Sequence, residues 1–208
     1  MARQGDHLFN PVTRTRVVFI AVPGDNGGHE LAVDWHVPPG EMLPAAPHYH
    51  VGPSGEIAET FTVIAGAATL KVGGQKLIVS APNAVDIGFN QIHTHPANAG
   101  SDELHVRQSG ARIVAEPEML TRVEQFLETL VALSQQGKAN RKGDITNLLQ
   151  AALTIHALLL DPTFLPILPR RFQTFAFGLL ARMARRRGYV AFHKPQVLAM
   201  EHAPVAAS

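Results

Sequence analysis

Short apolar runs alternate with glycine and proline turns through the first 115 residues of the chain. The runs are rich in β-branched and aromatic residues, which favour strands. Gly73-Gly74 separates two of them and is typical of a tight two-residue hairpin. The strands predicted on this basis cover residues 17–22, 31–37, 68–72, 75–79, 103–107 and 111–114. Many short strands at this spacing predict a sandwich or barrel, because closure of a double sheet protects the strand edges.

After Pro117 the apolar spacing changes from the strand period to the helix period. Apolar residues recur on one face from Met119 to Val131, and Gly137 is expected to end this helix. A second helix is expected to be capped by Asp144 and to end before Pro162, and a third to cover 170–187. The chain is therefore divided into a β domain over 1–115, a helical extension over 116–199 and a disordered tail over 200–208.

Composition excludes several classes of protein. At 208 residues and 46% hydrophobic content, the chain can bury a sizeable core. The net charge of +1 argues against a protein that binds nucleic acid with its whole surface. Cysteine is absent, so disulfides and thiolate ligands are excluded. The first residues lack the apolar core of a signal peptide, and no run of 18 apolar residues exists, so we expect a cytoplasmic protein without a transmembrane helix.

Histidine and acidic residues gather between positions 48 and 95. Alternate residues of a strand point to one face, so His48 and His50 can reach a single point. Glu59, which opens the next strand, and His93, from a later one, can close around that point. Three neutral imidazoles and one carboxylate suit a transition metal. The sequence therefore predicts one divalent ion per chain, either Fe, Mn, Ni, Cu or Zn.

The same residues resemble two motifs of the cupin superfamily. Pro39-Gly40 precedes His48-Tyr49-His50, and Glu59 is followed by six residues and then Gly66. An apolar segment over 85–90 leads to His93, with Asn98 behind it. The resemblance covers about residues 15 to 115 and is strongest to small bacterial cupins with a helical extension. It implies a mainly β fold, a double-stranded β-helix or jelly-roll barrel, with C-terminal helices.

Alternatives to this ligand set remain open at the level of sequence. Residues 52–55 look like a loop insertion before Glu59, so Glu56 could replace it as the carboxylate ligand. His95 could replace His93 if the register of the turn slips by two residues. A barrel that keeps its histidines for hydrogen bonding and binds no metal is a further possibility.

The cupin resemblance implies a small organic molecule in the barrel. A metal-dependent dioxygenase or an isomerase or cyclase is the leading prediction, although whether the chain is an enzyme stays open. A non-catalytic small-molecule binder or sensor is the alternative, and a structural cupin with an interaction surface on its helices is a third. The candidate acid–base groups are His105, His36 and His95. The aromatic residues expected in the pocket or the core are Trp35, Phe61 and Phe89.

The segment over 170–187 combines arginines with phenylalanines and leucines. It has the composition of a helix that lies on a membrane surface. We favour instead an apolar face docked on the barrel or on a partner subunit, with the basic end in solvent. Because cupins commonly pair and the predicted helices are strongly apolar, a homodimer is expected.

Overall fold

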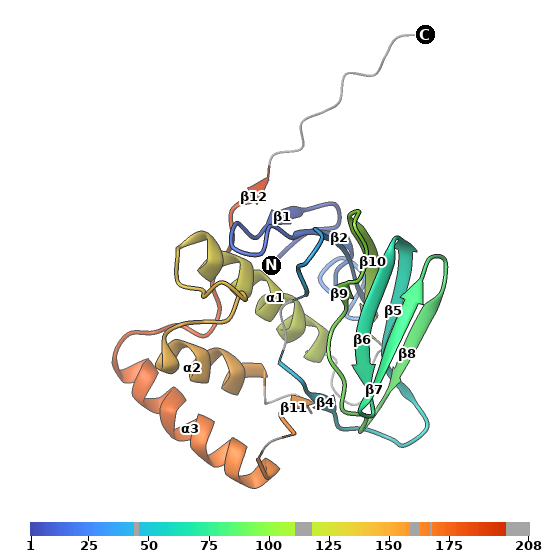
Figure 1. The fold of residues 1–208 in the computed structure, drawn as a ribbon. Helices are drawn as coiled ribbons and strands as arrows, with labels where there is room; N and C mark the ends of the chain where they lie inside the picture. Colours follow the sequence, from blue (N-terminus) through green and yellow to red (C-terminus); the bar gives the residue numbers. More distant parts are fainter. Residues whose placement is uncertain (44–45, 111–117, 159–162, 167, 199–208) are drawn as a thin grey trace.

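The computed structural model describes residues 1–43, 46–110, 118–158, 163–166 and 168–198 (Figure 1). The strand predicted at 111–114, the domain boundary predicted at 115/116 and the tail predicted at 200–208 lie outside these residues. The helices are α1 (Met119–Gln135), α2 (Leu148–Leu158) and α3 (Arg170–Arg186). The strands are β1 (His7–Phe9), β2 (Arg16–Ala21), β3 (Leu31–Val37), β4 (Tyr49–His50), β5 (Ile57–Ala65), β6 (Ala67–Val72), β7 (Gln75–Ser80), β8 (Ala84–Gly88), β9 (Ala97–Asn98), β10 (Leu104–Gly110), β11 (Thr163–Phe164) and β12 (Val197–Leu198).

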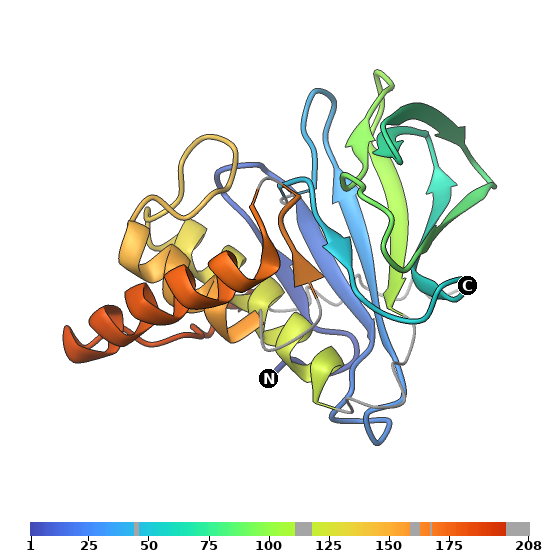
Figure 2. The same cartoon turned by 90° about the horizontal axis from the view of Figure 1, so that it is seen from below.

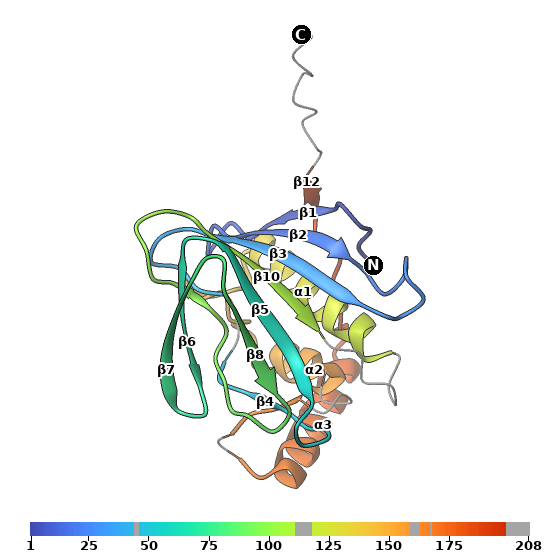
Figure 3. The same ribbon diagram turned by 90° about the vertical axis from the view of Figure 1, so that its right-hand side faces the viewer.

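Two antiparallel sheets face each other (Figure 3). The larger has the strand order β12-β1-β2-β3-β10-β5-β8, and the smaller has the order β7-β6-β9. Single bridges from Met42 to Ala97 and from His48 to His93 extend the smaller sheet towards β4. The predicted mainly β jelly-roll class is confirmed. β10, which contains most of the strand predicted at 103–107, lies inside the larger sheet between β3 and β5.

Turn residues of the barrel match their sequence signals. In the β6–β7 hairpin Val72 pairs with Gln75, so Gly73 and Gly74 form the predicted two-residue turn. Both glycines have positive φ, 57° and 85°, which this kind of hairpin requires. Asn90 also has a positive φ, 66°, a conformation that asparagine adopts more readily than most residues.

The core fills the space between the two sheets and continues between the larger sheet and α1 (Figure 2). Alternate residues of β3, such as Val33 and Trp35, point into it and are buried. Met119, Leu127 and Val131 of α1 belong to the same apolar cluster. Helix α1 therefore completes the core of the barrel, because its apolar stripe faces the sheet. The helix ends just before Gly137, as predicted, and Lys138 N donates to Leu133 O at 2.8 Å.

Helices α2 and α3 pack on each other and form a smaller apolar cluster. The predicted cap of α2 is wrong: Asn147 Oδ1 accepts hydrogen bonds from Leu149 N and Gln150 N, both at 3.0 Å. Asp144 instead accepts a bond from Asn140 Nδ2 at 3.0 Å in the preceding turn. As a result α2 begins four residues later than Asp144. Helix α3 ends before Gly188, as predicted. None of the helices within the described ranges is long and apolar enough to cross a bilayer.

Candidate metal centre

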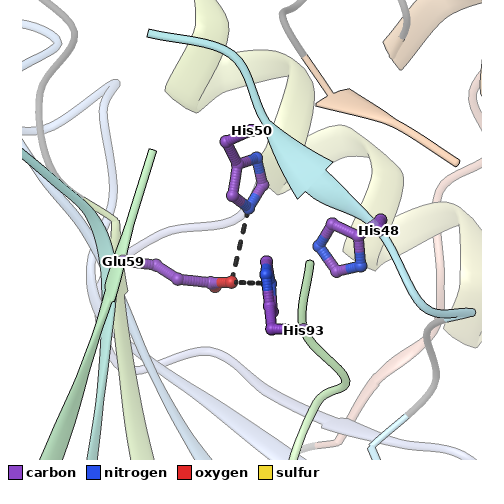
Figure 4. Close-up of side chains that lie close together, drawn as sticks. All are labelled: His48, His50, Glu59 and His93. Carbon is purple, nitrogen blue, oxygen red and sulfur yellow. Dashed lines mark hydrogen bonds and ion pairs between the residues drawn. The ribbon is translucent and has the colours of Figure 1, made fainter. Parts of the chain in front are cut away.

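Four predicted ligands meet inside the barrel (Figure 4). His50 lies on β4 with His48 just before it, Glu59 lies on β5, and His93 lies between β8 and β9. His48 N donates to His93 O at 3.1 Å, and His93 N donates to His48 O at 2.9 Å, which fixes the two histidine segments side by side. One ligand atom from each of the four residues lies within 4.8 Å of the other three.

Glu59 Oε1 is the point on which the imidazoles converge. It lies 3.3 Å from His50 Nε2 and 2.5 Å from His93 Nε2. The approach of His93 lacks hydrogen-bond geometry, so its buried Nε2 has no hydrogen-bond partner among the described residues. A buried nitrogen without a partner is costly in an apolar interior. A cation between these donor atoms would satisfy them all.

Backbone carbonyls orient two of the imidazoles. His48 Nδ1 donates to Ala46 O at 2.9 Å, and His93 Nδ1 donates to Gln91 O at 3.0 Å. A neutral imidazole carries one N–H, so these bonds leave the lone pair on Nε2 in both residues. Metal-binding histidines are commonly held in this way.

The charge states in the cluster also suit a cation. Burial lowers the pKa of His48 well below its usual range, and the neighbouring imidazole of His95 lowers it further. Burial opposes ionisation of Glu59, but the nearby imidazoles, led by the hydrogen bond from His50, outweigh it and hold the pKa of Glu59 well below its usual range. Neutral imidazole and ionised carboxylate are the forms that bind metal. The donor set therefore fits a divalent transition metal.

Glu56, the alternative carboxylate, is exposed in the turn before β5. It does not belong to the four-residue cluster. Glu59 is buried at 5% exposure and points at the histidines. The structure thus places Glu59, and not Glu56, among the imidazoles.

His95 lies beside the cluster and not within it. Its ring stands 5.1 Å from the His48 ring and 5.4 Å from the Phe61 ring, between centroids. Its Nδ1 is buried and has no hydrogen-bond partner in the part of the chain that the structure describes. Burial, opposed in part by the charge of Glu59, lowers the pKa of His95 to about 4. His95 is therefore a neutral side chain next to the ligands.

His36 and His105 are not brought to the centre. They pair across β3 and β10, and their rings stack at 4.4 Å. His36 Nδ1 bonds Glu103 Oε1 at 2.9 Å, and His105 Nε2 bonds Asp34 Oδ2 at 3.0 Å. Because Trp35 points into the core, the alternation of β3 places its neighbour His36 on the outer face. Both histidines belong to a surface network of charged residues.

Gln108 is part of the site although the sequence analysis did not single it out. Its side chain bonds Glu59 and lines the same cavity. The signal for it is the alternation of β10, in which Leu104 and Val106 point inward and are buried. Gln108 is a polar residue at the next inward position.

A cavity of about 270 Å³ opens from the cluster towards the helices. Its polar lining comes from His48, His50, Glu59, His95, Gln108 and Asp144. Most other lining residues are apolar, and they come from the barrel (Leu31, Val33, Ala58, Phe89), from α1 (Met119, Leu120, Val123, Phe126, Leu127, Leu130) and from the segment over 145–165 (Ile145, Ala151, Ile155, Leu158, Phe164, Leu165). Of the three aromatic candidates, Phe89 lines the cavity, whereas Trp35 and Phe61 are core residues.

No family model matches the chain, and no curated protein sequence matches it. Solved structures do. The cupin domain of an XRE family transcriptional regulator from Enterobacter cloacae has a TM-score of 0.37 at 17% identity, over 47% of this chain and 96% of that one. A cupin-like protein from Thermotoga maritima has a TM-score of 0.38 at 14% identity, over 54% and 77%. KdgF from Halomonas sp. has a TM-score of 0.35 at 18% identity, over 47% and 79%. The first two of these neighbours are, by name, a cupin domain and a cupin-like protein.

Proposed function

We propose that the chain binds one divalent transition metal ion and acts with it on a small, largely apolar organic molecule. One observation carries this proposal: a buried cluster of three histidines and a glutamate opens onto an apolar cavity. His48, His50, Glu59 and His93 would hold the ion. The cytoplasmic location and the homodimer stay predictions from the sequence.

A bound ion with open coordination positions supplies Lewis acidity, or activation of O₂ if the metal is redox-active. These two chemistries correspond to an isomerase or cyclase and to a dioxygenase. The protein's own part is to orient the imidazoles through Ala46 O and Gln91 O and to keep the carboxylate ionised. It also lines the cavity with apolar side chains of α1 and α2, which offer water no hydrogen-bond partners.

The lining of the cavity defines the class of substrate. Carbon atoms from leucine, isoleucine, valine and phenylalanine would surround the body of the molecule. The polar side chains lie mostly at the metal end, where His95 and Gln108 accompany the ligands. A fitting substrate therefore has an apolar body and one oxygen-bearing end that reaches the cluster. We propose that His95 contacts this polar end through its unpaired Nδ1.

The test uses protein loaded with Co²⁺, whose visible spectrum reports on ligands at the metal, and a library of small apolar carbonyl and enol compounds. We expect some of them to change the spectrum. Ala151→Phe would fill the cavity from α2 without touching the cluster. This variant should keep the metal and lose the spectral response. Ile78→Phe, at a position 69% exposed on β7, is the control and should keep both.

The products then separate the activities. Oxygen uptake with the Fe²⁺ protein indicates the dioxygenase, and a rearranged product without oxygen uptake indicates the isomerase or cyclase. A compound that binds at the metal and leaves unchanged with every metal tested identifies the non-catalytic binder or sensor. If Ala151→Phe responds to ligands as the wild type does, the cavity is not the binding site and the proposal is wrong.

A further inference from the structure

Helix α3 packs on α2 through a narrow face of small residues. Ala181 and Ala184 are buried there with Leu153 of α2. Gly178 lies so close to His156 that a Cβ at this position would stand 3.3 Å from the imidazole Nε2. These small residues let one side of α3 pack closely on α2. Figures 1 and 2 show α3 on the outer side of α2, away from the barrel.

The opposite side of α3 carries large apolar side chains in solvent. Phe172, Phe175, Leu179 and Met183 are 53%, 69%, 53% and 40% exposed. Their spacing of three and four residues places them in one stripe along the helix. We call these four residues the α3 stripe. The apolar face that was predicted to dock on the barrel or on a partner subunit is therefore exposed to solvent in the single chain.

Arginines flank the α3 stripe. Arg171 lies four residues before Phe175, and Arg182 lies three residues after Leu179, so both share its side of the helix. Seven of the 18 basic residues of the chain fall between 162 and 200, and none of its 17 acidic residues does. The arginines of α3 are exposed, and within the described residues none of them pairs with a carboxylate. A chain with a net charge of only +1 therefore concentrates positive charge around one apolar stripe.

The apolar stripe and the arginines around it together indicate what binds this face of α3. A two-fold pairing of α3 with its copy would bring arginines against arginines, with no carboxylate on either helix to offset the repulsion. A bilayer with acidic headgroups complements both features, because the stripe can enter the acyl boundary while the arginines reach phosphates. We propose that α3 binds this protein to anionic phospholipid surfaces, with the α3 stripe as the inserted face.

The position of α3 relates this surface to the cavity. Strand β11 leads into α3 and pairs with β4, the strand of His50. Phe164 and Leu165 line the cavity. The Arg170 guanidinium lies 5.6 Å from the Phe164 ring centre. If the proposed function holds, α3 would keep the cavity beside the lipid phase, into which an apolar substrate partitions.

The experiment is flotation of the full-length protein with vesicles of phosphatidylcholine, with or without about one third phosphatidylserine, an anionic lipid. The wild type should float with the anionic vesicles, much less with the neutral ones, and less as salt screens the charges. Phe172→Gln/Phe175→Gln and Arg182→Glu/Arg186→Glu should each weaken binding at least about tenfold. The controls Ile78→Gln and Arg141→Glu/Lys142→Glu change an equally exposed apolar side chain and another basic segment. They should bind as the wild type does.

The changed residues are exposed, so thermal melting and metal content should stay those of the wild type. Retention of both shows that a loss of flotation concerns the membrane surface and not the metal site. Absence of flotation by the wild type overturns the proposal, as does equal binding to neutral and anionic vesicles. If light scattering shows a dimer for the wild type and a monomer for the Phe172→Gln/Phe175→Gln variant, the α3 stripe is a dimer interface and not a lipid-binding face. If the protein does not bind lipid, and the Phe172→Gln/Phe175→Gln variant still binds an oligonucleotide as the wild type does, the arginines of α3 form a general polyanion site and the proposal is wrong.

Discussion

Gln108 Nε2 donates a hydrogen bond to Glu59 Oε2 at 2.9 Å, while Gln108 Oε1 accepts one from Trp35 Nε1 at 3.0 Å. The amide is thereby held at both ends, by the buried indole and by the carboxylate. Glu59 uses one oxygen for Gln108 and turns the other towards the histidines. Groups that orient a ligand in this manner commonly contribute to metal affinity.

We therefore expect Gln108→Leu to weaken metal binding by roughly 10- to 100-fold, because the carboxylate loses its anchor. Trp35 Nε1 would lose its partner as well, so some stability should be lost. Ser109→Ala, the next position on the same strand, is the control and should bind metal as the wild type does. Competition with a chromophoric chelator measures both affinities. Equal affinities would show that the amide contributes only to folding.

Glu59→Gln should lose metal more readily than Glu56→Gln. The first substitution removes a buried anionic oxygen from between the imidazoles, whereas the second changes an exposed turn residue. Dialysis against a chelator followed by elemental analysis compares the two variants with the wild type. The reverse order would mean that the inserted loop supplies the ligand.

His95→Leu should retain the metal, because its imidazole lies outside the four-residue cluster. Stability at neutral pH should be unchanged or higher, since a buried polar atom without a partner costs roughly 1–3 kcal/mol. Elemental analysis and urea unfolding check the two expectations. Loss of the metal from this variant would place His95 among the ligands.

Glu124 of α1, which is not part of the metal cluster, should make the free energy of unfolding depend on pH. Its side chain is fully buried, and burial raises its pKa to about 7 although it accepts a hydrogen bond from Ala2 N. A raised pKa means that the folded state holds the proton more tightly than the unfolded state. The stabilisation is then complete below pH 4.5, the ordinary value, and is lost as the pH rises through 7.

Glu124→Gln cannot ionise and should escape this loss. Between pH 5 and pH 8 its free energy of unfolding should rise relative to the wild type by up to ~2.5 kcal/mol, as one pKa unit corresponds to ~1.4 kcal/mol. Urea unfolding at both pH values measures the difference. Glu118→Gln, which alters an exposed acid just before the same helix, should show no such trend. Parallel curves for wild type and Glu124→Gln would contradict the raised pKa.

Much of the site follows from local sequence rules. His48 and His50 share a face because strands have a period of two. The glycine that follows Glu59 by seven positions, Gly66, has a φ of 84°, and a Cβ there would lie 3.3 Å from the backbone of Leu104. Asn98 has a structural role, because its side-chain amide donates hydrogen bonds to Val37 O and Asp102 O.

Other parts depend on long-range packing that no local pattern contains. The wall of the cavity comes from α1 and α2, whose apolar residues are equally compatible with a dimer interface. Gln108 binds Glu59 across 49 positions of sequence. The outward placement of His36 could have been read from the alternation of β3, whereas its stacking on His105 needs the pairing of β3 with β10. Sequence patterns therefore predicted the four residues of the cluster better than their surroundings.

Metal content tests the central claim most directly. The protein should be purified without a histidine tag and analysed by plasma mass spectrometry beside His48→Ala/His50→Ala. We expect about one divalent transition metal ion per wild-type chain, retained better at neutral than at acid pH because imidazoles must be unprotonated to bind. We expect almost none in the double variant. The same metal content in the folded double variant as in the wild type would contradict the assignment of the site.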